Sequence, residues 1–360
     1  MFGLIKSSKQ KQTAQVQPSG QVFQVEPGEK LLDAALRAGL DWPHDCRVGS
    51  CGSCKCKLLE GKVKELADFD YTLDEEEMES GMILACSSTL KSDVAVEVQL
   101  GSRENLEIGT VAGEIAKTTP LTHDILQVEI ALDEPLPPYT AGQYAEISVP
   151  GRIEHPRSYS FEKAPEDESP DRVTFQIRHV PKGEFTSWLH GENRNGEKVQ
   201  VSGPFGNLLA DPQKMLTERN DPMICVAGGS GMAPIKALLE HARNLECRRE
   251  TIFLFGARKQ EDLFCQEAMQ LLEESWAVTG GFSFIPVLSD EPSDSQWQGA
   301  RGLVTEKIAD LGLNFATADA FLAGPPPMID AAVETLTCCG VQEDRIFFDK
   351  FLDASHTSGR

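Results

Sequence analysis

The spacing of hydrophobic positions changes twice along the chain and divides the sequence into three stretches. Residues from about 19 to 103 combine short alternating segments with one helical pattern. Residues 104–218 contain short strand patterns separated by Pro and Gly, and residues 219–360 alternate strongly apolar strands with helices. We therefore expect a multidomain protein of three domains, preceded by a flexible tail over residues 1–18.

The first two stretches predict different kinds of sheet. A strand, a helix and further strands follow one another in the first stretch, which suits a small mixed α+β domain. The second stretch has short, regularly spaced strands, as in an antiparallel β-barrel. The strands expected are 21–25, 55–59 and 94–98 in the first stretch, with a helix near 31–36, and 125–130, 144–149, 173–178 and 198–201 in the second.

The third stretch has the pattern of a parallel sheet covered by helices on both faces. Residues 223–227 form a continuous apolar run, and a helical pattern follows from 233 to about 247. We therefore expect a doubly wound α/β domain. Its further strands are expected at 251–255, 282–288, 320–322 and 346–348, and its further helices near 263–272 and 328–338.

Composition and charge narrow the choice of partner. The chain has 360 residues, of which 40% are hydrophobic and 25% are charged, as in ordinary globular proteins. Its net charge of -22 would repel phosphates, so we expect no nucleic acid partner, whereas a basic protein surface would be attracted. No apolar run is long enough to span a membrane, and the start lacks a secretory signal. We expect a cytoplasmic protein; weak contact of the basic tail with a membrane surface is the alternative.

Four of the ten cysteines have the spacing of an iron–sulfur site. Cys46, Cys51 and Cys54 follow C-x4-C-x2-C, and Cys86 lies downstream, which is the plant-type [2Fe-2S] pattern. The Gly and Ser residues between them let the backbone wrap closely and point N–H donors at sulfur. A zinc site favours paired C-x2-C motifs, and disulfides do not suit a reducing compartment. Cys56 is expected on the opposite face of a strand, as a packing residue.

An acidic segment over residues 65–79 separates the third and fourth of these cysteines. Thr72 to Glu75 fits a capping box, with acidic residues in the first helical turn. Helix capping therefore explains part of the charge. Docking of a partner near the cluster is the other interpretation.

A flavin is predicted at the barrel. Arg157, Ser158, Tyr159 and Ser160 follow a strand pattern: an Arg can neutralise a pyrophosphate, a Tyr can lie against the isoalloxazine ring, and a Ser hydroxyl can hydrogen-bond flavin N5. Residues 183–186 then open a short helical pattern, whose start suits a phosphate. Each match is weak alone, and their order along one barrel pattern strengthens the prediction.

A nicotinamide nucleotide is predicted at the third stretch. Gly229, Gly231 and Pro234 give G-x-G-x-x-P between a buried strand and a helix, where glycine permits close approach to a pyrophosphate. Plain strand–loop–helix turns are the alternative, but three such loops at strand ends favour one shared crevice. The candidate contacts are Gly229, Ser230, Gly231, Met232, Pro234, Gly256, Arg258, Gly324, Pro325 and Met328.

Together these motifs resemble a known family. The segments HDCRVGSCGSCK, AGQYAEI, RSYSF, GGSGMAPI, FGAR and AGPPPMIDAA are similar to those of ferredoxin–reductase fusion proteins that feed electrons to bacterial oxygenases. The resemblance covers about residues 20–352. The chain looks most similar to the electron-transfer components of xylene monooxygenases, whose partner is a membrane di-iron hydroxylase. Reductases of benzoate dioxygenase, phenol hydroxylase and methane monooxygenase share the layout.

The resemblance implies a β-grasp ferredoxin domain, a six-stranded FAD barrel and a nucleotide-binding domain. It implies that Cys46, Cys51, Cys54 and Cys86 hold the [2Fe-2S] cluster. It places Phe348 or Phe351 near the flavin. The FAD contacts it implies are Arg157, Ser158, Tyr159, Ser160, Gln176, Ile177, Arg178, Gly183, Glu184, Phe185 and Thr186.

The implied function is that of an NADH-dependent reductase. NADH gives a hydride to FAD, held by Tyr159 and Ser160 as catalytic residues, and single electrons leave through the [2Fe-2S] cluster to an oxygenase, expected to be a di-iron hydroxylase. Arg258 and its neighbour Lys259 suit the 2′-phosphate of NADPH, but Glu261 and Asp262 oppose it, and the family mostly uses NADH. A Rieske dioxygenase or a sugar-deoxygenation system is the alternative acceptor; a non-catalytic electron carrier or regulatory module is the alternative class.

Two residues depart from the family pattern. Many relatives have Cys-Gly-Pro where this chain has Ala323, Gly324 and Pro325, and that Cys lies near their hydride path. We therefore expect nicotinamide positioning to differ here. Thr186 replaces a usual Ser and keeps the hydroxyl, so little change is expected from it.

Overall fold

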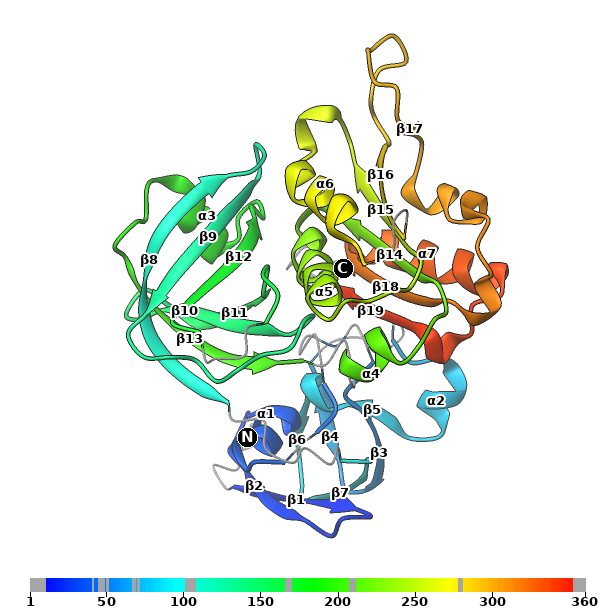
Figure 1. Cartoon of the computed structure of the whole chain (residues 1–360). Helices are drawn as coiled ribbons and strands as arrows, with labels where there is room; N and C mark the ends of the chain where they lie inside the picture. The colour runs from blue at the N-terminus through cyan, green and yellow to red at the C-terminus, as the bar shows by residue number, and fades with distance from the viewer. Residues whose placement is uncertain are drawn as a thin grey trace. The chain divides into compact units, whose positions relative to one another are not determined.

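The computed structural model falls into two compact units, Met1–Leu106 with Leu352–Arg360, and Glu107–Phe351 (Figure 1). The structure describes residues 11–40, 42–44, 49, 52–66, 69, 72–100, 108–165, 170–206, 212–277 and 281–351, without the side chains of 154, 155, 212 and 213.

The first unit is a mixed sheet crossed by one helix. Its strand order is β2-β1-β7-β3-β5, and α1 (Leu31–Arg37) buries its apolar residues in the core of this unit. The β1–β7 pair is parallel, whereas the other pairs are antiparallel. This confirms the predicted α+β ferredoxin fold. The strands are β1 (Gln12–Gln17), β2 (Val22–Val25), β3 (Lys55–Glu60), β5 (Met82–Leu84) and β7 (Val94–Glu97), with a separate pair β4 (Val63–Glu65) and β6 (Ser88–Leu90).

The predicted flexible tail is wrong for residues 12–17. These residues form β1, which pairs with β2 on one side and with β7 on the other. Ala14 and Val16 are fully buried while glutamines flank them, so the segment alternates as a half-buried strand does. The strand pattern is short, and its two apolar residues stand among polar ones, so the segment has the composition of a polar tail.

The acidic helix begins two residues later than the predicted capping box. Asp74, not Thr72, is the N-cap of α2 (Glu75–Glu79): its carboxylate accepts from the Glu77 amide at 2.7 Å, and the Glu77 side chain accepts from the Asp74 amide. The Thr72 hydroxyl instead donates to the Gly49 carbonyl at 2.7 Å. An Asp carboxylate competes well for the cap, which leaves the threonine available for the neighbouring loop.

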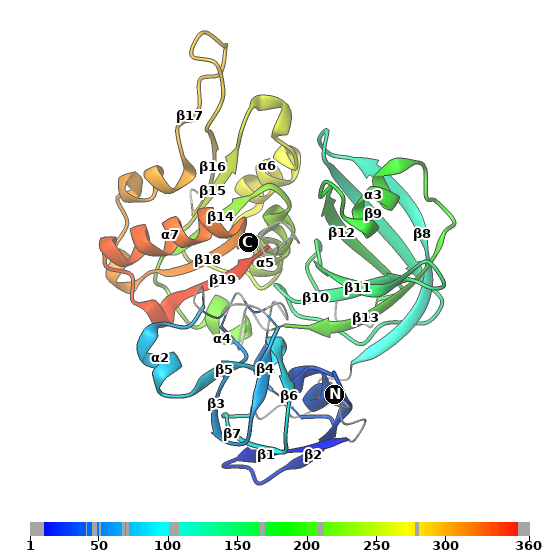
Figure 2. The same ribbon diagram turned by 180° about the vertical axis from the view of Figure 1, so that it is seen from behind.

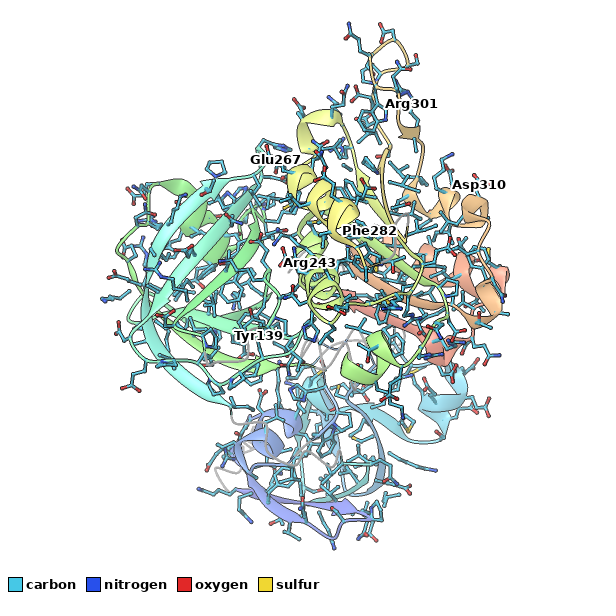
Figure 3. The ribbon with its side chains drawn as sticks, viewed as in Figure 1. Tyr139, Arg243, Glu267, Phe282, Arg301 and Asp310 are labelled. Atoms are coloured by element: carbon cyan, nitrogen blue, oxygen red, sulfur yellow. The ribbon has the colours of Figure 1, made fainter. Side chains whose placement is uncertain are left out.

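The second unit contains the predicted antiparallel barrel. Its six strands follow the order β11-β10-β13-β8-β9-β12, and a bridge between Phe161 and Phe175 brings the two edge strands together. Tyr139, labelled in Figure 3, stacks on Phe161 with ring centroids 3.9 Å apart. The elements are β8 (Gly109–Pro120), β9 (Ile125–Leu132), β10 (Tyr144–Val149), β11 (Ile153–Ser160), β12 (Arg172–Arg178), β13 (Lys198–Phe205) and α3 (Glu184–Gly191).

The rest of this unit is the predicted parallel sheet. Its order is β17-β16-β15-β14-β18-β19, and every pair is parallel. Helices α5 and α6 cover one face (Figure 1), and α7 covers the other (Figure 2). The elements are α4 (Pro212–Thr217), β14 (Met223–Gly228), α5 (Met232–Asn244), β15 (Thr251–Ala257), α6 (Gln266–Ser275), β16 (Phe282–Leu288), β17 (Ala300–Arg301), β18 (Asp319–Gly324), α7 (Pro326–Cys339) and β19 (Ile346–Lys350).

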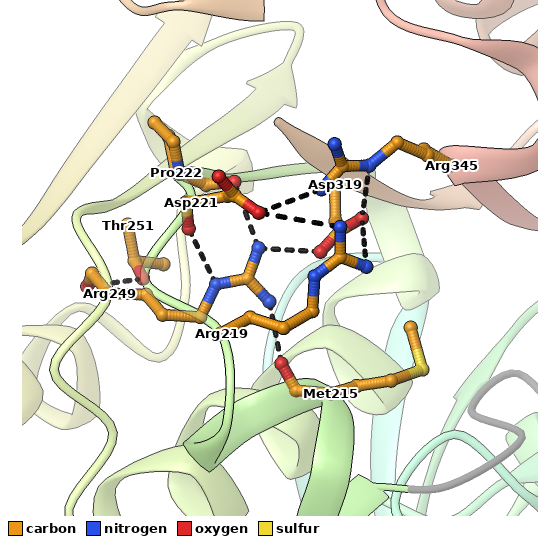
Figure 4. Close-up of polar contacts among 8 residues, drawn as sticks. All are labelled: Met215, Arg219, Asp221, Pro222, Arg249, Thr251, Asp319 and Arg345. Atoms are coloured by element: carbon orange, nitrogen blue, oxygen red, sulfur yellow. Dashed lines mark hydrogen bonds and ion pairs between the residues drawn. The ribbon is translucent and has the colours of Figure 1, made fainter. Parts of the chain in front are cut away.

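A buried charge cluster joins the strand starts of this sheet (Figure 4). Asp319, at the first residue of β18, is fully buried and contacts Arg249 at 2.6 Å, Arg345 at 2.9 Å and Arg219 at 3.1 Å. Arg249 is also fully buried and donates to the carbonyls of Met215 and Pro222. The cluster therefore ties β14, β15, β18 and the start of β19 at the edge opposite their carboxyl ends.

Replacing Asp319 with Ala should strongly destabilise this sheet. The change leaves the buried Arg249 without its carboxylate, and breaking a buried pair in this way costs about 3–5 kcal/mol. Urea unfolding followed by fluorescence would measure it. As a control, Glu129→Gln breaks an exposed pair with Arg172 and should cost less than about 1 kcal/mol. Equal losses in both variants would contradict this role.

Candidate functional site

The two described cluster cysteines lie at one end of the β3–β5 pair. Lys55 is opposite Leu84, and the Ala85 amide donates to the Cys54 carbonyl at 3.3 Å, so Cys54 and Cys86 come close together. Both thiols are buried. Cys46 and Cys51 lie outside the described residues.

A glycine of the cysteine loop packs against Ser87, the residue after Cys86. Gly49 lies between Cys46 and Cys51 in sequence and has a φ of +89°, and a Cβ there would lie 2.6 Å from the Ser87 hydroxyl. The hydrogen bond from Thr72 holds the same glycine. A close backbone approach next to two buried thiols fits the predicted [2Fe-2S] cluster, since thiolate ligands and backbone amides are what such a cluster needs.

The predicted flavin residues on β11 change from exposed to buried along the strand. Arg157 and Ser158 are exposed, Tyr159 is half-buried, and Ser160 is buried. The Tyr159 ring packs against Phe185 of α3, with centroids 5.5 Å apart. Burial raises the pKa of the Tyr159 phenol, so its hydroxyl stays protonated at neutral pH. The strand thus offers a cationic end, an aromatic ring and a buried hydroxyl in sequence.

A side chain of α3 itself, that of Thr186, closes the loop before the helix. The Thr186 hydroxyl accepts from the Val180 amide at 3.1 Å and donates to the Val180 carbonyl at 3.2 Å, which closes the loop before the helix. A Cβ on Gly183 would lie 2.7 Å from that hydroxyl, so glycine is required there. Glu184 is exposed and Phe185 is buried. Thr186 therefore shapes the predicted phosphate turn with its hydroxyl.

The three residues predicted on β12 point in different directions. The Ile177 side chain is in the barrel core, whereas exposed Arg178 pairs with Asp124 at 2.9 Å. Gln176 donates to the sulfur of Cys265 at 3.6 Å. Among the described residues, the buried Gln176 Oε1 and Thr174 Oγ1 atoms find no hydrogen-bond partner. Orphaned buried acceptors of this kind fit a site that a bound group completes.

The glycine loop after β14 lies against the loop after β18. A Cβ on Gly231 would overlap the Ala323 carbonyl oxygen. Met328 fills the adjacent space: its sulfur would lie 2.8 Å from a Cβ on Gly228, and its methyl 2.9 Å from one on Gly324. The amino ends of α5 and α7 therefore lie close together, as they do in doubly wound nucleotide sites.

The remaining predicted nucleotide residues divide into packing and surface positions. Met232 and Pro234 are buried in α5 and hold the helix in the core. Gly229 has a positive φ, Ser230 is half-buried, and Pro325 is the N-cap of α7. A Cβ on Gly256 would lie 3.1 Å from Val304. Arg258 is exposed and pairs with Asp290 at 3.5 Å.

The closing strand supplies a residue that the sequence analysis missed. Asp349 of β19 accepts a hydrogen bond from the Ser160 hydroxyl at 3.3 Å. Phe348, its neighbour, packs on the α7 side of the sheet and carries Lys350 over its ring, so it faces away from Ser160. Phe351 donates its amide to the Gly324 carbonyl at 2.8 Å. Of the two aromatic candidates, Phe351 thus contacts the end of β18 through its backbone, and flavin contact at Phe348 or Phe351 stays a prediction.

These features define a class: a plant-type ferredoxin domain joined to a flavin barrel and a nicotinamide-nucleotide domain. The family models agree, since residues 14–91 match the 2Fe-2S iron-sulfur cluster binding domain and residues 225–334 match the oxidoreductase NAD-binding domain. Accordingly, the chain is an oxidoreductase that uses a [2Fe-2S] cluster, FAD and a nicotinamide nucleotide.

Full-length relatives give the family. The chain is 38% identical to the xylene/toluene monooxygenase electron transfer component XylA of Pseudomonas putida, covering 94% of this chain and 93% of the relative. It is 32% identical to the propane 2-monooxygenase reductase component of Mycolicibacterium smegmatis, covering 91% and 94%. The crystal structure of the Amycolatopsis cytochrome P450 reductase GcoB matches with a TM-score of 0.79 at 29% identity, covering 95% and 99%. The chain belongs to the family of reductase components of monooxygenases.

Replacing Cys86 with Ser should abolish the cluster, whereas replacing Cys56 with Ser should not. Both thiols are buried, but only Cys86 belongs to the ligand spacing. Iron and acid-labile sulfide per chain would be measured together with the visible spectrum. The Cys56 variant is a matched control: its buried hydroxyl should cost about 1–3 kcal/mol of stability and leave iron content unchanged. Full iron content in the Cys86 variant would refute the assignment.

Proposed function

We propose that this chain takes hydride from NADH and delivers single electrons to the hydroxylase of a monooxygenase, a di-iron enzyme. The observation that carries the proposal is the meeting of the flavin strand and the nucleotide sheet at Ser160 and Asp349, 3.3 Å apart. These residues come from separate domains of one compact unit, and Asp349 lies opposite Ala323 in the β18–β19 register. The full-length relatives are reductase components, which argues against a non-catalytic carrier.

Each domain contributes a different task. When bound, FAD accepts a hydride and returns electrons singly, and a [2Fe-2S] cluster carries them one at a time. Arg157 offers a cation to a pyrophosphate, and Tyr159 offers its ring to the isoalloxazine. The Ser160 hydroxyl donates its proton to Asp349, so its oxygen would be left to accept a hydrogen bond from the bound flavin. Ala323 and Gly324, at the end of β18, would border the nicotinamide. Cys46, Cys51, Cys54 and Cys86 would hold the cluster.

We infer that the protein works in the cytoplasm, where NADH is available, and docks onto its acceptor there, including an acceptor embedded in the membrane. In the part of the chain that the structure describes, no helix has the length and apolarity needed to cross a bilayer. Cysteines outside the cluster motif carry free thiols, namely Cys56, Cys225, Cys247, Cys265, Cys338 and Cys339, which supports a reducing compartment.

The absorbance spectrum of the purified chain before and after NADH tests the proposal. We expect flavin and iron–sulfur bands that bleach together under anaerobic conditions, because the electrons pass from one group to the other. A purified hydroxylase then tests delivery: its reduction should require the cluster and fail in the Cys86→Ser variant. Bound FAD that NADH does not reduce would overturn the proposed function.

Replacing Asp290 with Asn should improve the use of NADPH. The Asp290 carboxylate partly neutralises Arg258, the cation that a 2′-phosphate would contact at the end of β15. An exposed pair of this kind is worth up to about 1 kcal/mol, so we expect kcat/KM for NADPH to rise about two- to fivefold. The value for NADH should stay nearly constant. Steady-state kinetics with both nucleotides measure this, and an unchanged NADPH value would exclude Asp290 as a determinant.

A further inference from the structure

A buried ion pair crosses between the flavin barrel and the nucleotide domain. Glu162 follows β11 two residues after Ser160 and is only 2% exposed. Its carboxylate lies 3.6 Å from the ammonium of Lys236, which is 8% exposed and sits on α5, one turn after the glycine loop. The pair therefore joins the strand predicted to hold the flavin to the helix that follows the predicted nucleotide loop.

Neighbouring groups complete this contact, which we call the α5 clasp: Glu162, Lys236, Glu240, Gln127 and the Ala164 amide. Gln127 donates to both oxygens of Glu162, at 2.8 and 2.9 Å. Lys236 pairs with Glu240 at 2.8 Å and donates to the Glu162 carbonyl at 3.4 Å. Glu240 in turn accepts from the Ala164 amide at 3.2 Å. Three of these contacts run from α5 to the barrel domain, so the clasp joins the two domains.

The charges of the clasp disfavour any arrangement that separates the domains. Burial alone would lower the pKa of the Lys236 ammonium, but the Glu240 and Glu162 carboxylates outweigh it and raise the pKa, so the group stays charged. Withdrawing this cation would leave two carboxylates close together, one of them deeply buried. A buried charge without its partner is strongly unfavourable. The clasp therefore holds α5 in one position against β11.

Resting on the proposed function, we propose that Lys236 and Glu162 are positioning residues that set the geometry of hydride transfer. Nucleotide binding uses loops of one domain, whereas hydride transfer needs the nicotinamide and the flavin at near-contact distance across two domains. A shift of about 1 Å between reacting groups can cost about a hundredfold in rate. Loosening the clasp should therefore slow the transfer while leaving nucleotide affinity intact.

The test compares three variants of the full chain: Lys236→Met, Glu162→Gln and the double variant. Stopped-flow reduction of the bound FAD at saturating NADH should be about tenfold slower in Lys236→Met, with the apparent Kd for NADH within about twofold of the parent value. The double variant should be faster than Lys236→Met, because neutralising Glu162 removes the stranded carboxylate. Strictly additive losses would overturn the pairing, and an unchanged rate in Lys236→Met would overturn the positioning role.

Hydrogen–deuterium exchange gives a readout that does not depend on turnover. We expect faster exchange in the first turns of α5 and in residues 160–164 of Lys236→Met, with FAD content unchanged. Lys198→Met is the matched control, since Lys198 forms solvent-exposed ion pairs with Glu114 and Asp133, and all three residues belong to the barrel domain. It should alter neither exchange at α5 nor the reduction rate. A control as slow as Lys236→Met would show that loss of any lysine suffices and would refute the clasp.

A second variant keeps the proposal testable if Lys236→Met fails to fold. If Lys236→Met does not retain FAD, Glu162→Gln carries the test, because the amide keeps the shape, weakens the attraction to Lys236 and still offers Gln127 one acceptor oxygen. A reduction rate and α5 exchange equal to those of the parent would then refute the proposal. If the parent FAD is not reduced by NADH at all, the proposed function fails instead, and exchange at α5 still decides whether the clasp exists.

Discussion

The nucleotide half of the molecule depends on one steric constraint: the glycine loop after β14 must lie directly on the backbone of β18. A side chain at Gly231 would overlap the Ala323 carbonyl, and a Cβ on Gly324, whose φ is +148°, would lie 3.1 Å from the Gly228 carbonyl oxygen. Because the carboxyl ends of these two adjacent central strands touch, the helices that follow them start close together. The direction of α5 follows from this contact, and with it the position of Lys236.

Ion pairs add a second constraint on the positions of the strands and of α5. At the amino edge of the sheet, Asp319 gathers arginines that come from three different connections, so the strand starts hold one spacing. On the flank of the sheet, the Glu162–Lys236 pair acts between domains. Apolar surfaces can slide past one another at small cost, whereas a buried ion pair that is pulled apart leaves an uncompensated charge. The polar contacts therefore disfavour arrangements in which the strand starts or α5 are displaced.

Much of this architecture could be predicted because its signals are local. The strands 144–149 and 282–288 agree with β10 and β16 residue for residue, since continuous or alternating apolar runs bounded by turns are strong signals. Strand β1 was not predicted from the sequence, because its only apolar residues are Ala14 and Val16. Asp74 rather than Thr72 caps α2, a choice between two good caps that spacing alone does not decide. Domain organisation and cofactor classes were therefore predictable, and exact element starts were not.

The contacts between domains were not predictable, because they join residues far apart in sequence. Asp349 reaches Ser160 across 189 positions, and Lys236 reaches the Glu162 carbonyl across 74. Neither carboxylate belongs to a recognisable motif, and a charged residue two positions beyond a flavin strand reads as surface until its burial is known. Sequence patterns report the faces of single elements, whereas the relative placement of two domains depends on pairs that no periodicity links.

The position of Ala323 explains why such placement matters in this chain. Ala323 is fully buried and stands opposite Ala227 in the parallel register of β14 and β18. An alanine offers the nicotinamide no sulfur contact, and its carbonyl is already covered by Gly231. The orientation of the nicotinamide toward the flavin then depends on how the two domains are held against each other, which is the task that we propose for the Glu162–Lys236 pair.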